Sequence, residues 1–213
     1  MPWKRSLNSL AMLMLMSSSI ANAQSADSFK TAEYNEMGYN VLDAVNAASA
    51  YANGYTGKGV IVGVCDDPIN FLVPEFDLKQ NSEMINVAGA GVYNWANFTH
   101  GTHVAAIAAS SADVYKGMAP ESDIVVVATD KSESGIIDAL AYLLDYAEKE
   151  KKPIAINLSM GTVIGFKDGT DPIASMIDEL LDKSGKKCLM AIAAGNEGHR
   201  NSTIVTETTG QGE

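Results

Sequence analysis

The sequence predicts an α/β fold in which helices cover both faces of a mostly parallel sheet. Four continuous apolar runs have the length and composition of strands that are buried on both faces. Segments with helical apolar spacing alternate with these runs, which is the pattern of strand–helix–strand units. Polar side chains follow directly after three of the strands, at Asp66, Ser159 and Asn196. Sites in parallel sheets form at the carboxyl ends of strands, so these residues are the first functional candidates.

Composition limits the class of protein. The chain has 213 residues, of which 46% are hydrophobic, enough for one sizeable domain with a real core. The formal net charge of −11 argues against nucleic acid or an anionic membrane surface as a partner.

The first 23 residues have the pattern of a cleaved secretory signal peptide. Lys4 and Arg5 precede a short apolar stretch, residues 10–16, and Ala21-Asn22-Ala23 has the form of a cleavage site. The alternative is a membrane anchor, but the stretch is too short to cross a bilayer, and no other run is long enough. We therefore expect a secreted protein, cleaved near Ala23, with an N-terminal lead-in over 24–45 and a domain over 46–213.

The predicted strands and helices follow one another in a regular order. The strands are residues 60–65, 123–128, 153–158 and 188–193. The helices are an Ala-rich segment over 41–52, one that opens at His100, one capped by Ser134, and one capped by Asp171 and ended by Gly185. Residues 24–40 and 69–97 are expected to be irregular.

Two cysteines, Cys65 and Cys188, lie inside predicted strands. Buried unpaired cysteines behave as small hydrophobic residues, and we interpret both in this way. A disulfide would require their Cα atoms to lie within about 7 Å of each other.

Three residues could together perform nucleophilic catalysis. His100 begins a helix of small residues, a rigid position suited to a general base. Asp66 can orient such an imidazole, and the amide of Asn196 can donate to an oxyanion. Taken singly, Asp66 is equally well a cap or turn residue, and Asn196 a turn residue.

Two other kinds of site, a zinc site and a dinucleotide-binding loop, fit the sequence less well. His100 and His103 are three positions apart, whereas helical zinc ligands are usually four apart, and His199 is the only other histidine. The glycines around Lys58 precede a strand instead of following one, which excludes a dinucleotide fingerprint.

Four blocks of sequence resemble those of the subtilisin-like serine proteases, or subtilases. They are Val60-Ile-Val-Gly-Val-Cys-Asp66, His100-Gly-Thr-His-Val-Ala105, Asn157-Leu-Ser-Met-Gly161 and Ala193-Ala-Gly-Asn-Glu-Gly198. The lead-in over 50–59 is similar to that of autotransporter subtilases, and the resemblance covers about residues 45–200. It implies a three-layer subtilisin-like fold and a serine endopeptidase that hydrolyses proteins or peptides bound in an extended conformation.

The resemblance also implies a role for each matching residue. Asp66 would orient His100, His100 would be the general base, His103 would be structural, and Asn196 would be the oxyanion donor. Ser159, Met160 and Gly161 would pair with the substrate backbone. Ala193, Ala194 and Gly195 would form one wall of the pocket for the residue before the scissile bond.

The nucleophile of the family does not occur in these 213 residues. In the order Asp, His, Ser, the serine lies about 150 residues after the histidine, here near position 250. The catalytic domain is therefore expected to be C-terminally incomplete: a fragment, a truncated product, or a relative that has lost catalysis. The alternative function is a catalytically dead subtilase module that binds peptides along Ser159–Gly161.

A second departure lies beside the acid, where the family has Asp-Thr/Ser-Gly and this chain has Asp66-Asp67-Pro68. Proline removes an amide donor, and Asp67 places a like charge next to Asp66, which we expect to raise the pKa of one carboxyl group. We expect the acid still to work. No cofactor is predicted and no metal site; calcium often binds subtilases, but no calcium ligand set can be identified.

Overall fold

Five parallel strands form the central sheet of the computed structural model, which describes residues 22–24, 28–30, 45–79, 83–86, 99–112, 116–162, 165–166 and 168–197. They are β3 (Ile61–Asp66), β4 (Glu83–Asn86), β5 (Asp123–Ala128), β6 (Ile154–Leu158) and β7 (Cys188–Ile192). Their order across the sheet is β4-β5-β3-β6-β7. Because β3 pairs with β5 on one side and β6 on the other, the chain changes direction across the sheet at β3.

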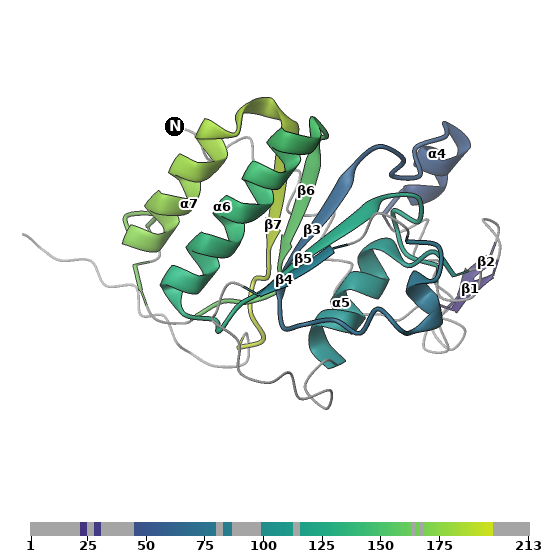
Figure 1. Ribbon diagram of the computed structural model, residues 1–213, viewed down its shortest axis with the longest axis horizontal. Coiled ribbons are helices and arrows are strands. Elements are labelled where there is room, and N and C mark those ends of the chain that lie inside the picture. The colour runs from purple at the N-terminus through teal and green to yellow at the C-terminus, as the bar shows by residue number, and fades with distance from the viewer. Residues whose placement is uncertain are drawn as a thin grey trace, which may run out of the picture.

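Helices cover both faces of this sheet, as Figure 1 shows. α5 (Thr99–Ala109) lies on one face, and α6 (Glu133–Glu150) and α7 (Pro172–Lys183) lie on the other. The three-layer α/β arrangement predicted from the sequence is confirmed.

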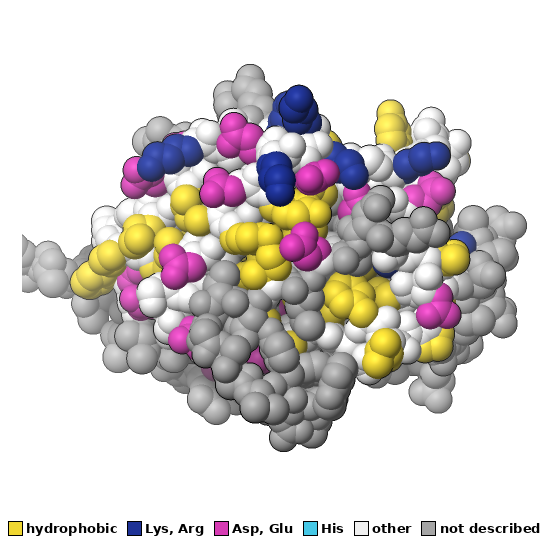
Figure 2. Space-filling model, viewed as in Figure 1, with side chains coloured by type: hydrophobic (Ala, Val, Ile, Leu, Met, Phe, Trp, Pro, Cys, Tyr) yellow, Lys and Arg dark blue, Asp and Glu magenta, His cyan; other side chains and the backbone are white. Residues whose placement is uncertain are grey.

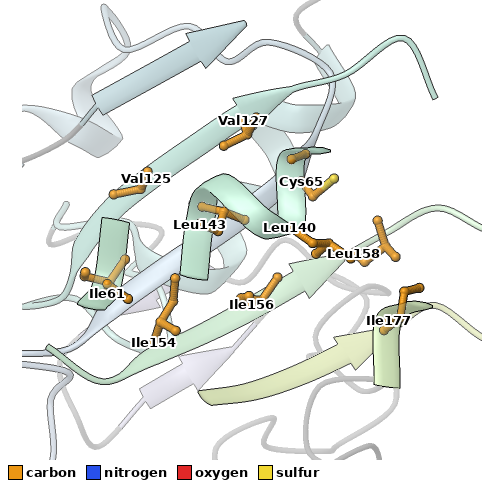
Figure 3. Packing of buried hydrophobic residues seen from close by; sticks show 12 residues of the cluster. Ile61, Cys65, Val125, Val127, Leu140, Leu143, Ile154, Ile156, Leu158 and Ile177 are labelled. Carbon is orange, nitrogen blue, oxygen red and sulfur yellow. The ribbon is translucent and has the colours of Figure 1, made fainter. Parts of the chain in front are cut away.

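Alternation along β3 and β5 separates two hydrophobic cores. In β3, Val62 and Val64 pack on the α5 side, whereas Ile61 and Cys65 pack on the α6 side. Figure 3 shows the α6-side core, in which Leu140 and Leu143 lie over strand residues. Asp66 follows Cys65, so the period of two directs its side chain to the α5 side of the sheet.

Small residues allow α5 to lie close to the sheet. Ala105, Ala108 and Ala109 are buried against a surface that includes Val64 and Val126. The prediction of a closely packed small-residue helix beginning near His100 is confirmed.

The helix caps agree with the sequence in one case and differ in the other. Asp171 caps α7 by accepting from the Ile173 amide, and Gly185, with φ 71°, follows the end of that helix. The predicted cap of α6 was wrong by two positions: Ser132, not Ser134, accepts from the Gly135 amide. Both serines fit an N-cap by type, and only backbone geometry distinguishes them.

The irregular segments contain structure that the sequence did not indicate. Within 69–97 lie β4 and a 3-10 turn, η2 (Pro74–Phe76). β4 is four residues long and on the edge of the sheet, which leaves little periodicity to detect. β1 (Asn22–Gln24) and β2 (Ser28–Lys30) form an antiparallel pair, and α4 (Ala47–Ala52) is shorter than the predicted helix, whose residues 41–44 lie outside the described residues.

Both cysteines are free, as predicted. Cys65 is near the carboxyl end of β3 and Cys188 is at the amino end of β7, so the two residues lie toward opposite ends of the parallel strands. Burial, with a smaller contribution from the neighbouring Asp66 charge, raises the pKa of Cys65 to about 12. Among the described helices, none has the length and apolar character needed to cross a membrane.

Candidate active site

The site is centred on a hydrogen bond between Asp66 and His100. Nδ1 of His100 lies 2.7 Å from Oδ1 of Asp66. The Asp66 side chain is fully buried, whereas that of His100 is 52% exposed. A carboxylate at this distance accepts from Nδ1–H, which leaves Nε2 as the nitrogen able to accept a proton.

Two backbone features bring these residues together. β3 ends at Asp66, and α5 starts one residue before His100. Gly101 lies so close to the loop after β3 that a Cβ atom there would overlap the carbonyl oxygen of Asp67. The Asn70 amide also donates to Oγ1 of Thr102 over 2.9 Å, which fastens the same loop to the first turn of α5.

The charge state of Asp66 is set by opposing effects. Burial raises the pKa of Asp66, while its hydrogen bonds from His100 and the Asp67 amide lower it, and the charge of Asp67 raises it further. The predicted direction is therefore confirmed, but burial is the largest cause and Asp67 the smallest. Within the described part of the chain, Oδ2 of Asp66 has no hydrogen-bond partner.

Asp67 is held by a lysine from another part of the chain. Its amide donates to Oδ1 of Asp66 over 2.7 Å, and its carboxylate pairs with Nζ of Lys131, 2.9 Å from Oδ1 and 3.0 Å from Oδ2. Lys131 lies in the turn between β5 and α6.

The segments expected to bind substrate lie at the same carboxyl edge. Ser159 follows β6, and its Oγ accepts from Nδ2 of Asn157 over 2.8 Å. The Ala193 amide donates to the Leu158 carbonyl, and a Cβ on Gly161 would lie 3.8 Å from the Ala193 oxygen. The segments 159–161 and 193–195 are therefore neighbours, and Met160 packs at the edge of the α6-side core.

Asn196 follows β7, the last strand that the structure describes, in an exposed turn. The backbone N–H of Asn196 donates to the Glu197 carboxylate over 2.9 Å, and the preceding Gly195 has φ 92°, a conformation that favours glycine. Ala194 is also exposed. Parallel strand order places this turn on the same edge as Asp66, two strands away.

His103 does not join the pair. It lies one helical turn after His100, and its Nε2 is buried with no hydrogen-bond partner among the described residues. Burial, and secondarily the charge of His100, lowers the pKa of His103. A half-buried ring whose charged form is disfavoured fits the structural role that the resemblance implies.

Two other features have the composition of a binding site. Ligand atoms of Asp66, Asp67 and His100 lie within 4.8 Å of one another, and Asp67 already has the Lys131 ammonium as its counter-ion. A cavity of about 620 Å³ lies between α6 and α7 near the amino ends of β6 and β7, at the other edge of the sheet. Lysines gather there (Figure 2), and two that line it are paired with Asp123 and Glu179.

The sequence did not point to Lys131 or to the steric role of Gly101. Lys131 is 64 positions from Asp67, in a turn with no motif of its own, so nothing local marks it. The HGTH block contains Gly101, but the need for glycine at this position comes from a backbone contact with Asp67, which exists only in the folded chain.

The fold and this geometry define an α/β protein with an oriented Asp–His pair at the carboxyl edge of its parallel sheet. Comparison with known proteins agrees: the Subtilase family matches residues 57–211. The chain belongs to the subtilase family of serine proteases.

Individual relatives share part of their length with this chain. An extracellular serine protease of Serratia marcescens is 42% identical over 106 residues, which cover 47% of this chain and 10% of that protein. The serine protease AprX of Bacillus subtilis is 31% identical over 183 residues, which cover 77% of this chain and 39% of that protein. The chain thus spans less than half the length of these relatives.

Solved structures support the fold. The CspB protease of Clostridium perfringens matches with a TM-score of 0.61 and 24% identity, over 73% of this chain and 40% of that one. Sphericase matches with a TM-score of 0.52 and 24% identity, over 70% of this chain and 50% of that one.

Proposed function

We propose that this chain supplies the acid, the general base and the oxyanion donor of a secreted serine endopeptidase, whose nucleophilic serine comes from sequence after Glu213. The observation that carries the proposal is the 2.7 Å hydrogen bond between Nδ1 of His100 and the buried Asp66 carboxylate. It fixes the tautomer in which Nε2 accepts the serine proton and later returns it to the leaving amine.

The other predicted residues complete the reaction. The Asn196 amide would stabilise the oxyanion that forms when the serine attacks the scissile carbonyl. An extended peptide would add to the backbone of Ser159–Gly161, beside the pocket wall formed by Ala193–Gly195. The adjacency of these two segments supports this arrangement.

The coding region after codon 213 provides the first test. A Gly-Thr-Ser block near position 250 would support the peptidase, whereas a stop codon would favour the peptide-binding module. For the gene product that carries the block, we expect reaction with a fluorophosphonate probe and cleavage of an unfolded protein substrate. Both should be lost in His100→Ala and kept in His199→Ala; equal labelling of His100→Ala would overturn the proposal.

Export forms the second part of the proposal. The basic residues, apolar stretch and Ala21-Asn22-Ala23 motif support cleavage near Ala23, and the Serratia relative is itself named as extracellular. N-terminal sequencing of exported protein should begin at Gln24. Ala23→Leu should block cleavage, whereas Ala26→Leu should not; an unprocessed wild-type N-terminus would contradict this.

A further inference from the structure

The residue next to the catalytic acid carries the same charge as the acid. Asp67 follows Asp66 directly and is 25% exposed, so its charge is only partly screened by water. A second carboxylate here disfavours ionised Asp66 and favours protonated His100. Both effects oppose a general base, which has to be unprotonated to act.

Lys131 supplies the opposing charge. Its Nζ lies within 3.0 Å of both carboxylate oxygens of Asp67, so the two charges cancel beside the Asp66–His100 pair. The pair also keeps the Asp67 side chain turned toward the β5–α6 turn.

Lys131 has an unusual backbone conformation in the turn that brings its side chain to Asp67. Its φ is 66°, in the left-handed region that a lysine rarely adopts. The Lys131 amide donates to Oγ1 of Thr129 over 3.2 Å, and the Thr129 amide donates to the carbonyl oxygen of Asp66 over 3.1 Å. The turn that presents the lysine is therefore hydrogen-bonded to the backbone of the catalytic acid.

The first turn of α6 encloses this turn from the other side. A Cβ on Gly135 would overlap Oδ1 of Asp130, and that same oxygen accepts from the Ser132 amide over 2.9 Å. A disfavoured backbone conformation that is held on both sides is typical of functional positions.

We propose that Lys131 is a positioning residue of the acid–base pair, which fixes the Asp67 carboxylate through its ammonium group and cancels the charge of Asp67 at His100. The inference rests on the proposed function, because it assigns Lys131 a task in the same site. Among the described residues, the charged and titratable groups that face this pair are Asp66 and Asp67 after β3, with Lys131 on the outer side of Asp67, and His103 on α5.

The test is an NMR titration of the histidine rings in the full-length protein, which does not depend on a nucleophile. The signal that disappears in His100→Gln is assigned to His100. In Lys131→Met, we expect the midpoint of the His100 titration to move to higher pH. Lys131→Arg should restore the wild-type midpoint, and the double variant Lys131→Met with Asp67→Asn should return toward it.

Two further variants separate charge from folding. Lys131→Gly tolerates the positive φ and removes only the side chain, so it should shift the midpoint as Lys131→Met does. Lys149→Met removes an exposed lysine at the far end of α6 and should leave it unchanged. An unmoved midpoint in both Lys131→Met and Lys131→Gly, with the fold intact by circular dichroism, would overturn the proposal. Failure of the fluorophosphonate test with a shifted midpoint would instead overturn only the peptidase function.

Discussion

Gly101 packs directly against the carbonyl group of Asp67, so that the first turn of α5 and the loop after β3 touch through their backbones. Since His100 precedes Gly101 and Asp66 precedes Asp67, this close backbone contact brings His100 and Asp66 together. The absence of a side chain at Gly101 is therefore what allows this close approach.

Replacing Gly101 tests this relationship. Gly101→Ala should lower the free energy of unfolding by about 1–3 kcal/mol, because the new methyl group meets backbone atoms that have no room to move. Urea denaturation measures the loss. Gly161→Ala is the matched control, since a Cβ there makes only an ordinary 3.8 Å contact, and should change stability by less than about 0.5 kcal/mol. Equal stability of the two variants would contradict the steric argument.

Asp66→Asn should change how the stability of the fold depends on pH. Because burial raises the pKa of Asp66, the folded state holds that proton to higher pH than the unfolded state does. The free energy of unfolding of the wild type therefore falls as pH rises from the unfolded pKa through the folded one. Asp66→Asn removes this fall, so its stability relative to the wild type should rise across that acid range and then stay level.

The control for this experiment is Asp77→Asn, which changes an exposed carboxylate after η2. Thermal denaturation at a series of pH values gives both curves. A difference between Asp66→Asn and the wild type that does not vary with pH would show that burial of the carboxylate is not the source of the effect.

Lys79 should make stability depend on pH at the alkaline side. Its Nζ donates to the carbonyl oxygens of Pro120 and Ser122 over 2.8 and 2.6 Å, and burial lowers the pKa of Lys79 from 10.5 to about 8. Between these values the unfolded chain holds the proton and the folded chain does not, so the free energy of unfolding should rise with pH. Lys79→Met should abolish that rise, whereas Lys58→Met, at an exposed position, should preserve it.

Ser132 and Ser134 offer a direct comparison of two candidate caps. Ser132→Ala should lower the free energy of unfolding by about 1 kcal/mol, because the Gly135 amide loses its acceptor at 3.0 Å. Ser134→Ala should cost less than about 0.5 kcal/mol. Guanidinium denaturation of both variants decides; a larger loss for Ser134→Ala would move the helix start to the position that the sequence suggested.

The elements with strong local patterns were predictable. The continuous apolar runs of β3, β5, β6 and β7 and the Asp171-Pro172 start of α7 each carry their signal within a few residues. β4 escaped prediction because a four-residue edge strand depends on its pairing with β5 more than on its own composition. The cap of α6 was predicted two positions too late, at Ser134, because a cap is defined by backbone dihedral angles, which residue type alone does not give.

Motif spelling and apolar periodicity are local properties of the chain, so the fold class, the family and the candidate residues Asp66 and His100 could be predicted without coordinates. Three contacts required the folded chain: the 2.7 Å hydrogen bond between these two side chains, the packing of Gly101 on the Asp67 carbonyl, and the ion pair of Lys131 with Asp67. Each of these contacts joins residues 34 to 64 positions apart. Such contacts arise from the order of the strands and the packing of the layers, which cannot be predicted from any single segment of the sequence.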